Sequence, residues 1–140
     1  FKKASGILSF VWYTAKVNYI YKFKGKVRKG AKRGKLLGFP TANVALHQEI
    51  PEGIYASTVV FNGKQYIAAT FIGAPKTFES IGYKAESYIL DFNQDLYGKW
   101  ISVKLFKKIR DNKKFNNPKE LVAQMKKDVQ LVRLFFSKDI

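Results

Sequence analysis

Residues 25–44, GKVRKGAKRGKLLGFPTANV, are the stretch around which this chain is organised. Four glycines recur in it at short intervals: Gly25, Gly30, Gly34 and Gly38. Glycine lets a backbone bend sharply and bring its N–H groups close to an anion. The intervening side chains include six basic ones: Lys26, Arg28, Lys29, Lys32, Arg33 and Lys35. This composition predicts a loop that can hold phosphate groups.

The stretch ends on Pro40-Thr41-Ala42-Asn43, where a rigid turn leads into an alternating segment typical of a strand. Side chains alternate along a strand, so Thr41 and Asn43 should share one face. A hydroxyl and an amide oxygen suit a hard cation such as Mg²⁺ when phosphates supply its other ligands. Glycine spacing alone is weak evidence, and a charged surface loop before an ordinary strand is its simpler interpretation. The loop and the Thr-x-Asn pair together favour the phosphate site.

Composition limits the chemistry. The chain has 140 residues, enough for one domain with a single core. It contains no cysteine, and His47 is its only histidine, which excludes thiolate and histidine-cluster metal sites. Catalysis would therefore depend on carboxylates, hydroxyls, amides and backbone groups. A reducing compartment is compatible with this composition, and we expect a cytoplasmic protein. The apolar run at 7–15 is too short to span a bilayer, so no membrane partner is expected.

The formal net charge of +16 has three interpretations: a nucleic-acid surface, a lysine-biased soluble surface, or a site for a polyphosphate ligand. Nearly all of the 26 basic residues are lysines spread along the chain. Nucleic-acid surfaces favour arginine, because its guanidinium makes bidentate contacts. The nucleic-acid interpretation is therefore weakened, and the polyphosphate interpretation needs only the cluster at 26–35.

Alternating apolar and polar residues predict successive strands at 17–27, 41–46, 54–61, 65–72, 84–92 and 99–107. Asn62-Gly63 predicts a two-residue hairpin turn, and 73–82 a second long loop. Asn117-Pro118 then begins an amphipathic helix that runs to about Phe136 and should pack on the sheet. Short connections between antiparallel strands indicate a closed barrel or a sandwich. We expect 1–18 to be an N-terminal segment or linker remnant, and 19–140 to be the domain.

A second motif lies at 85–92, AESYILDF, followed by DLYG at 95–98. Glu86 stands near the start of an otherwise apolar strand. A carboxylate there could position and deprotonate an alcohol that attacks a phosphate. For a lone glutamate in a strand, a solvent-facing side chain paired with a nearby lysine is the simpler interpretation.

Both motifs resemble the signature of the riboflavin kinase family, which includes the kinase half of bifunctional bacterial FAD synthetases. The first match consists of Gly25, Val27, Gly30, Arg33, Gly34, Leu37, Gly38, Phe39, Pro40, Thr41, Ala42, Asn43 and Val44. The second comprises Glu86, Asp91-Phe92 and Asp95-Leu96-Tyr97-Gly98. Further similarity at 72–78 and from Arg110 to Leu121 extends the resemblance over roughly 19–132. It implies a compact antiparallel six-stranded Greek-key β-barrel with a C-terminal helix.

The resemblance also implies a function: phosphorylation of the riboflavin 5′-hydroxyl by ATP, giving FMN and ADP. Glu86 would act as the base, and Thr41 and Asn43 would hold Mg²⁺ or another divalent cation. Arg110 and Phe115 would contact the flavin, although an arginine paired with carboxylates at a helix entry is an equal alternative. The residues expected around the ATP phosphates are Arg28, Gly30, Lys32, Arg33, Gly34, Lys35, Gly38 and Pro40.

The chain departs from the family pattern at a few positions. Tyr88 stands where many members have histidine, Pro75-Lys76 shifts a proline by one place, and Asp111-Asn112 replace proline and glutamate. Two other functions stay open: a basic barrel that binds RNA or single-stranded DNA, and an inactive flavin-binding relative. The chain could be a free-standing kinase or follow an adenylyltransferase domain, for whose chemistry its single histidine is insufficient.

Overall fold

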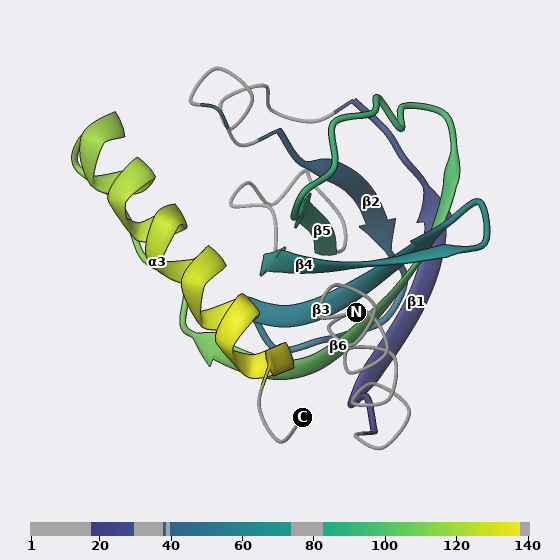
Figure 1. The fold of residues 1–140 in the computed structure, drawn as a ribbon, viewed down its shortest axis with the longest axis horizontal. Helices are drawn as coiled ribbons and strands as arrows, with labels where there is room; N and C mark the ends of the chain where they lie inside the picture. Colours follow the sequence, from purple (N-terminus) through teal and green to yellow (C-terminus); the bar gives the residue numbers. More distant parts are fainter. Residues whose placement is uncertain (1–17, 30–37, 39, 74–82, 138–140) are drawn as a thin grey trace, which may run out of the picture.

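The computed structural model describes residues 18–29, 38, 40–73 and 83–137. This part of the chain forms one antiparallel sheet and one long helix (Figure 1). The elements are β1 (Tyr21–Lys26), β2 (Ala42–Leu46), β3 (Gly53–Phe61), β4 (Lys64–Gly73), β5 (Tyr83–Ile89), β6 (Trp100–Arg110) and α3 (Pro118–Ser137).

The sheet has six strands in the order β1-β6-β3-β4-β5-β2. Strands β3, β4 and β5 are consecutive neighbours, and β6 returns to lie beside β3, which is the Greek-key arrangement. The two edges approach each other through an antiparallel bridge between Arg28 and Asn43, where the Arg28 N–H donates to the Asn43 carbonyl at 2.7 Å. The predicted six-stranded Greek-key barrel is therefore confirmed as a nearly closed barrel with a C-terminal helix.

The predicted hairpin joins β3 to β4. Asn62 and Gly63 have φ values of 54° and 78°, the left-handed conformation that a two-residue turn requires. Other strand ends differ from expectation. Strand β1 occupies Tyr21–Lys26 of the expected 17–27. Strand β5 stops at Ile89 instead of continuing to 92, because the chain turns at Asp91, whose φ is 56°. Strand β6 continues to Arg110, beyond the expected 107.

The barrel interior is apolar, with one buried hydroxyl chain across three strands. Ser57 Oγ donates to the Ala68 carbonyl at 2.9 Å, so Thr70 must donate to Ser57, at 2.6 Å. Ser87 in turn donates to Thr70, at 2.8 Å. Each hydroxyl carries one hydrogen, so this direction satisfies every member of the chain. The network joins β3, β4 and β5 inside the barrel, and β5 is also the strand that carries Glu86.

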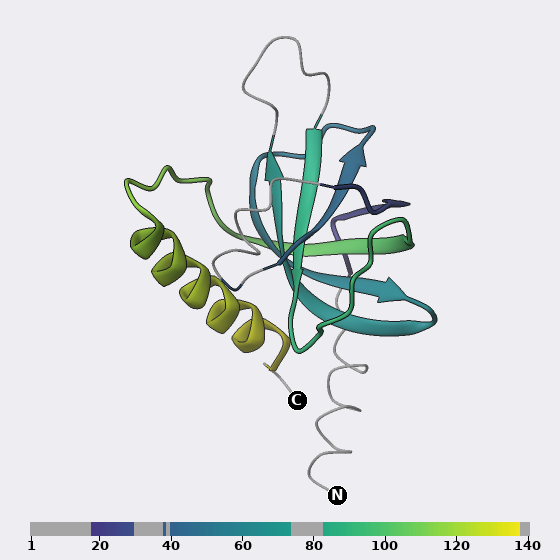
Figure 2. The ribbon, with the colours of Figure 1, turned by 90° about the horizontal axis from the view of Figure 1, so that it is seen from above.

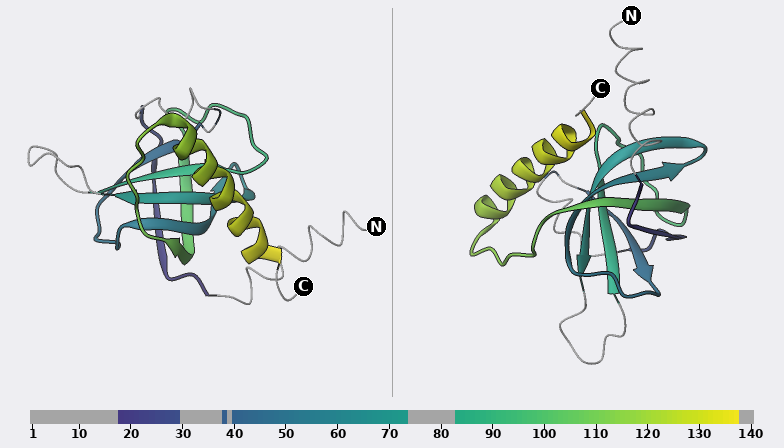
Figure 3. Two further views of the ribbon diagram at one scale, coloured as in Figure 1. Left: turned by 90° about the vertical axis from the view of Figure 1, so that its left-hand side faces the viewer. Right: turned by 90° about the horizontal axis from the view of Figure 1, so that it is seen from below.

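Helix α3 crosses the outside of the barrel, on the side opposite β1 (Figures 1 and 2). Its second half packs tightly: Val132 and Phe136 are buried against Phe106 and Leu90. The side views show the helix lying obliquely over the sheet, with the segment after β6 looping out to its start (Figure 3). Within the described residues, no helix combines the length and apolarity needed to cross a bilayer.

Candidate active site

One transverse row of the sheet carries three of the predicted site residues, Asn43, Glu86 and Arg110. In the strand registers, five residues stand opposite one another from β2 to β6: Asn43, Glu86, Phe71, Ile54 and Arg110. Directly opposed residues project to the same face of a sheet. This face is the outer one, toward α3, because neighbours such as Ala42, Ala85 and Ile72 belong to the barrel core. The fold thus aligns residues from distant parts of the sequence along one line.

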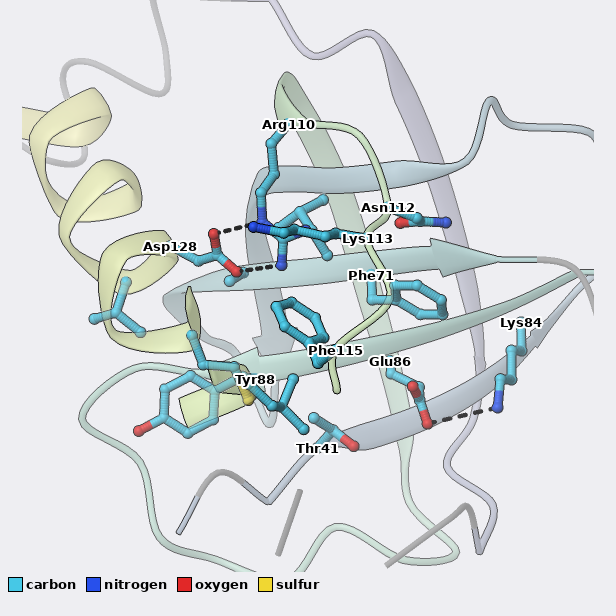
Figure 4. A pocket seen from close by; sticks show the side chains of 15 residues that line it. Thr41, Phe71, Lys84, Glu86, Tyr88, Arg110, Asn112, Lys113, Phe115 and Asp128 are labelled. Atoms are coloured by element: carbon cyan, nitrogen blue, oxygen red, sulfur yellow. Dashed lines mark hydrogen bonds and ion pairs between the residues drawn. The ribbon is translucent and has the colours of Figure 1, made fainter. Parts of the chain in front are cut away.

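A pocket of about 320 Å³ opens between this face and α3 (Figure 4). Its floor comes from the sheet, through Ala69, Phe71 and Tyr88. Helix α3 supplies the opposite wall, through Leu121 and Met125 in its first half and Val129 just past its middle. The segment after β6 closes one side, with Phe115 reaching into the space between the two walls. The lining is mostly apolar with a few polar groups, as in sites for organic ligands of this size.

Glu86 lies at one end of the pocket, close to Thr41 (Figure 4). Its side chain is 19% exposed, so the carboxylate is sheltered but can be reached from the cavity. The Lys84 ammonium stands 3.7 Å from Glu86 Oε1, a loose ion pair that leaves room for a further hydrogen bond. Glu86 therefore has the lysine neighbour that the simpler interpretation expects, and it also lines the pocket; its role as a base stays a prediction.

Thr41 lines the same end of the pocket, and Asn43 stands opposite Glu86 in the β2–β5 register. Both are half-buried. These oxygen donors suit a hard cation but are too few to hold one alone. Within the described residues no three His, Cys, Asp or Glu side chains gather as a metal site. A divalent cation would fit here only if a bound ligand, such as a phosphate chain, supplied further oxygens.

The structure describes only some of the predicted phosphate-binding residues. Arg28, Gly38 and Pro40 are exposed, and Gly38 has a φ of 88°, a conformation that glycine adopts readily. Gly30, Lys32, Arg33, Gly34 and Lys35 lie outside the described residues. Phosphate binding by this stretch stays a prediction.

Arg110 and Phe115, the predicted flavin contacts, both line the pocket. The Arg110 guanidinium is also held by the protein. It donates to both carboxylate oxygens of Asp128, from Nε and Nη2, each at 2.7 Å, and from Nη1 to the Asp111 carbonyl at 3.0 Å. Its carbon Cζ lies 6.0 Å from the centre of the Phe115 ring. The pairing of Arg110 with a carboxylate, which the sequence offered as the alternative to flavin contact, is therefore present.

Sequence reasoning missed Asp128. It is 4% exposed although charged, and the Gln124 amide also donates to it, at 3.0 Å. The available signal was its position in the helix. Asp128 falls between Met125 and Val129 on the apolar face, where a charged residue needs a partner.

Asn112 adds an unsatisfied acceptor to the pocket. Its amide nitrogen donates to Glu52 Oε1 at 3.1 Å and to the Ile72 carbonyl at 3.3 Å, which fixes the orientation of the side chain. The carbonyl oxygen Oδ1 is buried and has no hydrogen-bond partner among the described residues. A ligand N–H or O–H could complete it.

Comparison with known proteins agrees with the geometry. The sequence model of the Flavokinase family, described as riboflavin kinase, matches residues 17–136. The bifunctional riboflavin kinase/FMN adenylyltransferase of Listeria monocytogenes is 39% identical over 126 residues, covering 87% of this chain and 40% of that protein. The chain spans between 18% and 40% of the length of the curated relatives that it matches first.

Two solved structures are similar. Riboflavin kinase from Trypanosoma brucei superposes with a TM-score of 0.62 at 27% identity, covering 84% of this chain and 80% of that one. A structure from Streptococcus pneumoniae described as a macrolide-efflux protein gives a TM-score of 0.74 at 36% identity, covering 80% of this chain and 38% of that one.

Proposed function

Since this chain belongs to the riboflavin kinase family, we propose that it transfers the γ-phosphoryl group of ATP to the 5′-hydroxyl of riboflavin, giving FMN and ADP. One observation supports this reaction most directly. The apolar pocket ends at Glu86 and Thr41, so an aromatic body and a reacting hydroxyl could be held together.

The flavin ring would lie in the apolar part of the pocket, between the sheet face and the first half of α3. Phe71, Tyr88 and Phe115 offer aromatic surfaces that suit a planar ring system. The buried Oδ1 of Asn112 would accept a hydrogen bond from the ligand. The ribityl chain would then run toward Glu86, which brings its terminal hydroxyl to the carboxylate.

Glu86 would accept the proton of the 5′-hydroxyl as the oxygen attacks the γ-phosphorus and the bond to the ADP oxygen breaks. In phosphoryl transfer such a group mainly orients and activates the nucleophile. Thr41 and Asn43 would hold a divalent cation against the nucleotide phosphates, and the cation would neutralise their charge. The backbone N–H groups of 28–38 would bind the same phosphates, with the basic side chains adding attraction.

The test is riboflavin phosphorylation by the purified chain with ATP and Mg²⁺, the products being separated by chromatography and EDTA serving as the control. FMN that forms only with the metal supports the proposal. Riboflavin binding without FMN would indicate an inactive relative. Loss of both would refute the proposal, and a titration with single-stranded RNA would then be the next measurement.

Replacing Glu86 with Gln should lower kcat by about 10²- to 10⁴-fold, because the amide cannot accept the proton. Riboflavin affinity and melting temperature should stay close to those of the wild type, since shape and hydrogen-bonding capacity are nearly kept. Lys84→Gln is the matched control: it removes the loose partner of Glu86, and only a small effect on kcat is expected. Wild-type turnover in Glu86→Gln would refute the assigned role.

For the full-length protein we propose, from the names of the bifunctional relatives, an adenylyltransferase domain ahead of this chain, within a cytoplasmic enzyme. The intact polypeptide would then convert FMN to FAD in the same assay, whereas residues 1–140 alone would stop at FMN. FAD formation by the isolated chain would contradict this division of labour.

A further inference from the structure

The two halves of α3 relate differently to the sheet. In the second half, Val132 and Phe136 are buried in a cluster with Ala56, Leu90 and Phe106. In the first half, Leu121 and Met125 face the pocket. Among the described residues, the helix side chains that pack in this buried cluster therefore all lie in the second half, and the partly buried Leu121 and Met125 are not among them.

The Arg110–Asp128 pair stands between the two halves. Arg110 is the last residue of β6, and Asp128 lies in the middle of α3. Their side chains are 18% and 6% exposed, and both line the pocket (Figure 4). Two hydrogen bonds of 2.7 Å join the planar guanidinium to the planar carboxylate, and Gln124 holds the carboxylate from the helix side. A bidentate ion pair of this kind allows little variation in the distance or tilt between the guanidinium and the carboxylate.

We propose that Arg110 and Asp128 are a positioning pair that sets the separation of α3 from the sheet, and so the width of the slot that receives the flavin ring. This inference rests on the proposed function, because it takes the pocket to be the riboflavin site. The pair acts through the walls of the pocket, so its loss should weaken riboflavin binding more than ATP binding or the chemical step.

Burial explains why such a pair can fix a distance. Separating two sheltered, oppositely charged groups would leave each without a partner in a poorly solvated place. Apolar side chains can slide past one another and stay in contact, whereas the Arg110–Asp128 pair would lose its hydrogen bonds. Three of the five N–H donors of Arg110 are already used within the protein, which favours a positioning role over direct ligand binding.

A second ion pair on the same helix supplies a matched control. Arg133 donates to both carboxylate oxygens of Asp91, at 2.9 and 3.0 Å, and so also joins α3 to the barrel. That pair is exposed, and neither residue lines the pocket. Removing it also deletes a helix-to-barrel ion pair, but one that does not bound the slot. Asparagine at 91 would keep the left-handed conformation that the backbone has there.

The experiment compares the wild type with Arg110→Met/Asp128→Leu, Asp128→Glu and the control Arg133→Met/Asp91→Asn. The apolar double replacement fills similar volume and should stay folded, because replacing both members of a buried pair is well tolerated. Asp128→Glu keeps the charge and adds one methylene, which displaces the helix. Riboflavin Kd is measured by quenching of flavin fluorescence, KM for ATP and kcat by FMN formation, and folding by thermal melting.

We expect the Kd for riboflavin to rise by about tenfold or more in both test variants, since a gap of about 1 Å between the ring and a pocket wall forfeits a large share of their dispersion contacts. The KM for ATP should change by less than about twofold, and the control should resemble the wild type. Folded test variants that bind riboflavin normally would overturn the positioning role, as would an equal loss in the control. A wild-type chain that does not bind riboflavin would instead refute the proposed function itself.

Discussion

At the scale of single residues, Tyr55 couples the stability of the barrel to alkaline pH. It is 1% exposed, and its hydroxyl donates to the Pro51 carbonyl at 2.6 Å. Burial raises the pKa of Tyr55 above its ordinary value, and the neighbouring Tyr21 adds to the rise. The folded protein thus favours the neutral phenol, whereas the unfolded chain releases the proton at about pH 10. This contribution to stability is full below about pH 10 and is lost as the pH rises further.

Tyr55→Phe should therefore melt lower than the wild type at about pH 8, by an amount equivalent to about 1 kcal/mol for the lost hydrogen bond. At about pH 11 the difference should shrink, because ionisation of this group in the unfolded chain lowers the free energy of unfolding of the wild type and cannot do so in Tyr55→Phe. Tyr97→Phe, at a side chain that is 55% exposed, is the control. Parallel curves for wild type and Tyr55→Phe across this range would contradict the assignment.

At the residue level, a continuous motif was enough to single out residues that lie together in the structure, and their roles stay predictions. Thr41 and Glu86 were named from two separate motifs, and the structure brings both to one pocket. Asp128 was missed because its partner lies 18 positions away, at the end of another element. Helical periodicity shows that a charge sits on the apolar face but not which group meets it. The same limit applies to Asn112, whose unpaired oxygen is visible only once the fold is known.

At the scale of elements, the start of α3 depends on its cap. Asn117 Oδ1 accepts from the Glu120 N–H at 2.9 Å, and Glu120 Oε1 accepts from the Asn116 N–H at 3.2 Å. Proline at the first helical position supports the same boundary. Because the first half of the helix borders the pocket, order at this end should matter for the ligand as well as for the fold.

Asn117→Ala should lower the free energy of unfolding by about 1 kcal/mol and weaken riboflavin binding, since the first turn would fray. Urea denaturation and flavin-fluorescence titration measure the two effects. Lys119→Ala, an exposed change in the same turn, is the control. A loss of stability without any change in riboflavin affinity would show that the helix start does not support the pocket wall.

The elements themselves were largely predictable. Alternation found all six strands, Asn62-Gly63 found the hairpin, and Asn117-Pro118 found the helix start. The ends were less predictable because they depend on tertiary contacts. Strand β6 continues to Arg110 while alternation is lost near Phe106, where irregularities in its pairing with β3 turn the side chain toward α3. A bulge of this kind has no reliable signature in one sequence.

At the scale of the whole molecule, alternation could not distinguish a barrel from a sandwich. The nearly closed form depends on pairings between distant segments: β1 with β6, β2 with β5, and the Arg28–Asn43 bridge. The row of Asn43, Glu86 and Arg110 likewise depends on the registers of β2 with β5, β5 with β4, β4 with β3 and β3 with β6. The closed barrel was therefore predicted from the family resemblance and not from the alternation of residues.

The charge of the whole molecule should make its stability depend on salt. The net charge is +16, and the described stretches 18–29 and 99–110, which contain β1 and β6, hold ten basic residues and no acidic one. Lys22 stands directly opposite Lys104 in the β1–β6 register. Like charges in this position repel, and self-repulsion destabilises a compact state. Screening should therefore raise the melting temperature by a few degrees between about 50 and 500 mM NaCl.

Lys22→Glu tests the origin of that effect, because it converts the like-charge pair with Lys104 into an attractive one. We expect stabilisation of about 0.2–1 kcal/mol at low salt and a shallower dependence of the melting temperature on NaCl. Lys127→Glu on α3 makes the same change in net charge away from this strand pair and separates the local effect from the global one. Equal stabilisation by both variants would assign the effect to net charge alone. A melting temperature that falls with salt in the wild type would show instead that attractive ion pairs dominate, and the repulsion argument would fail.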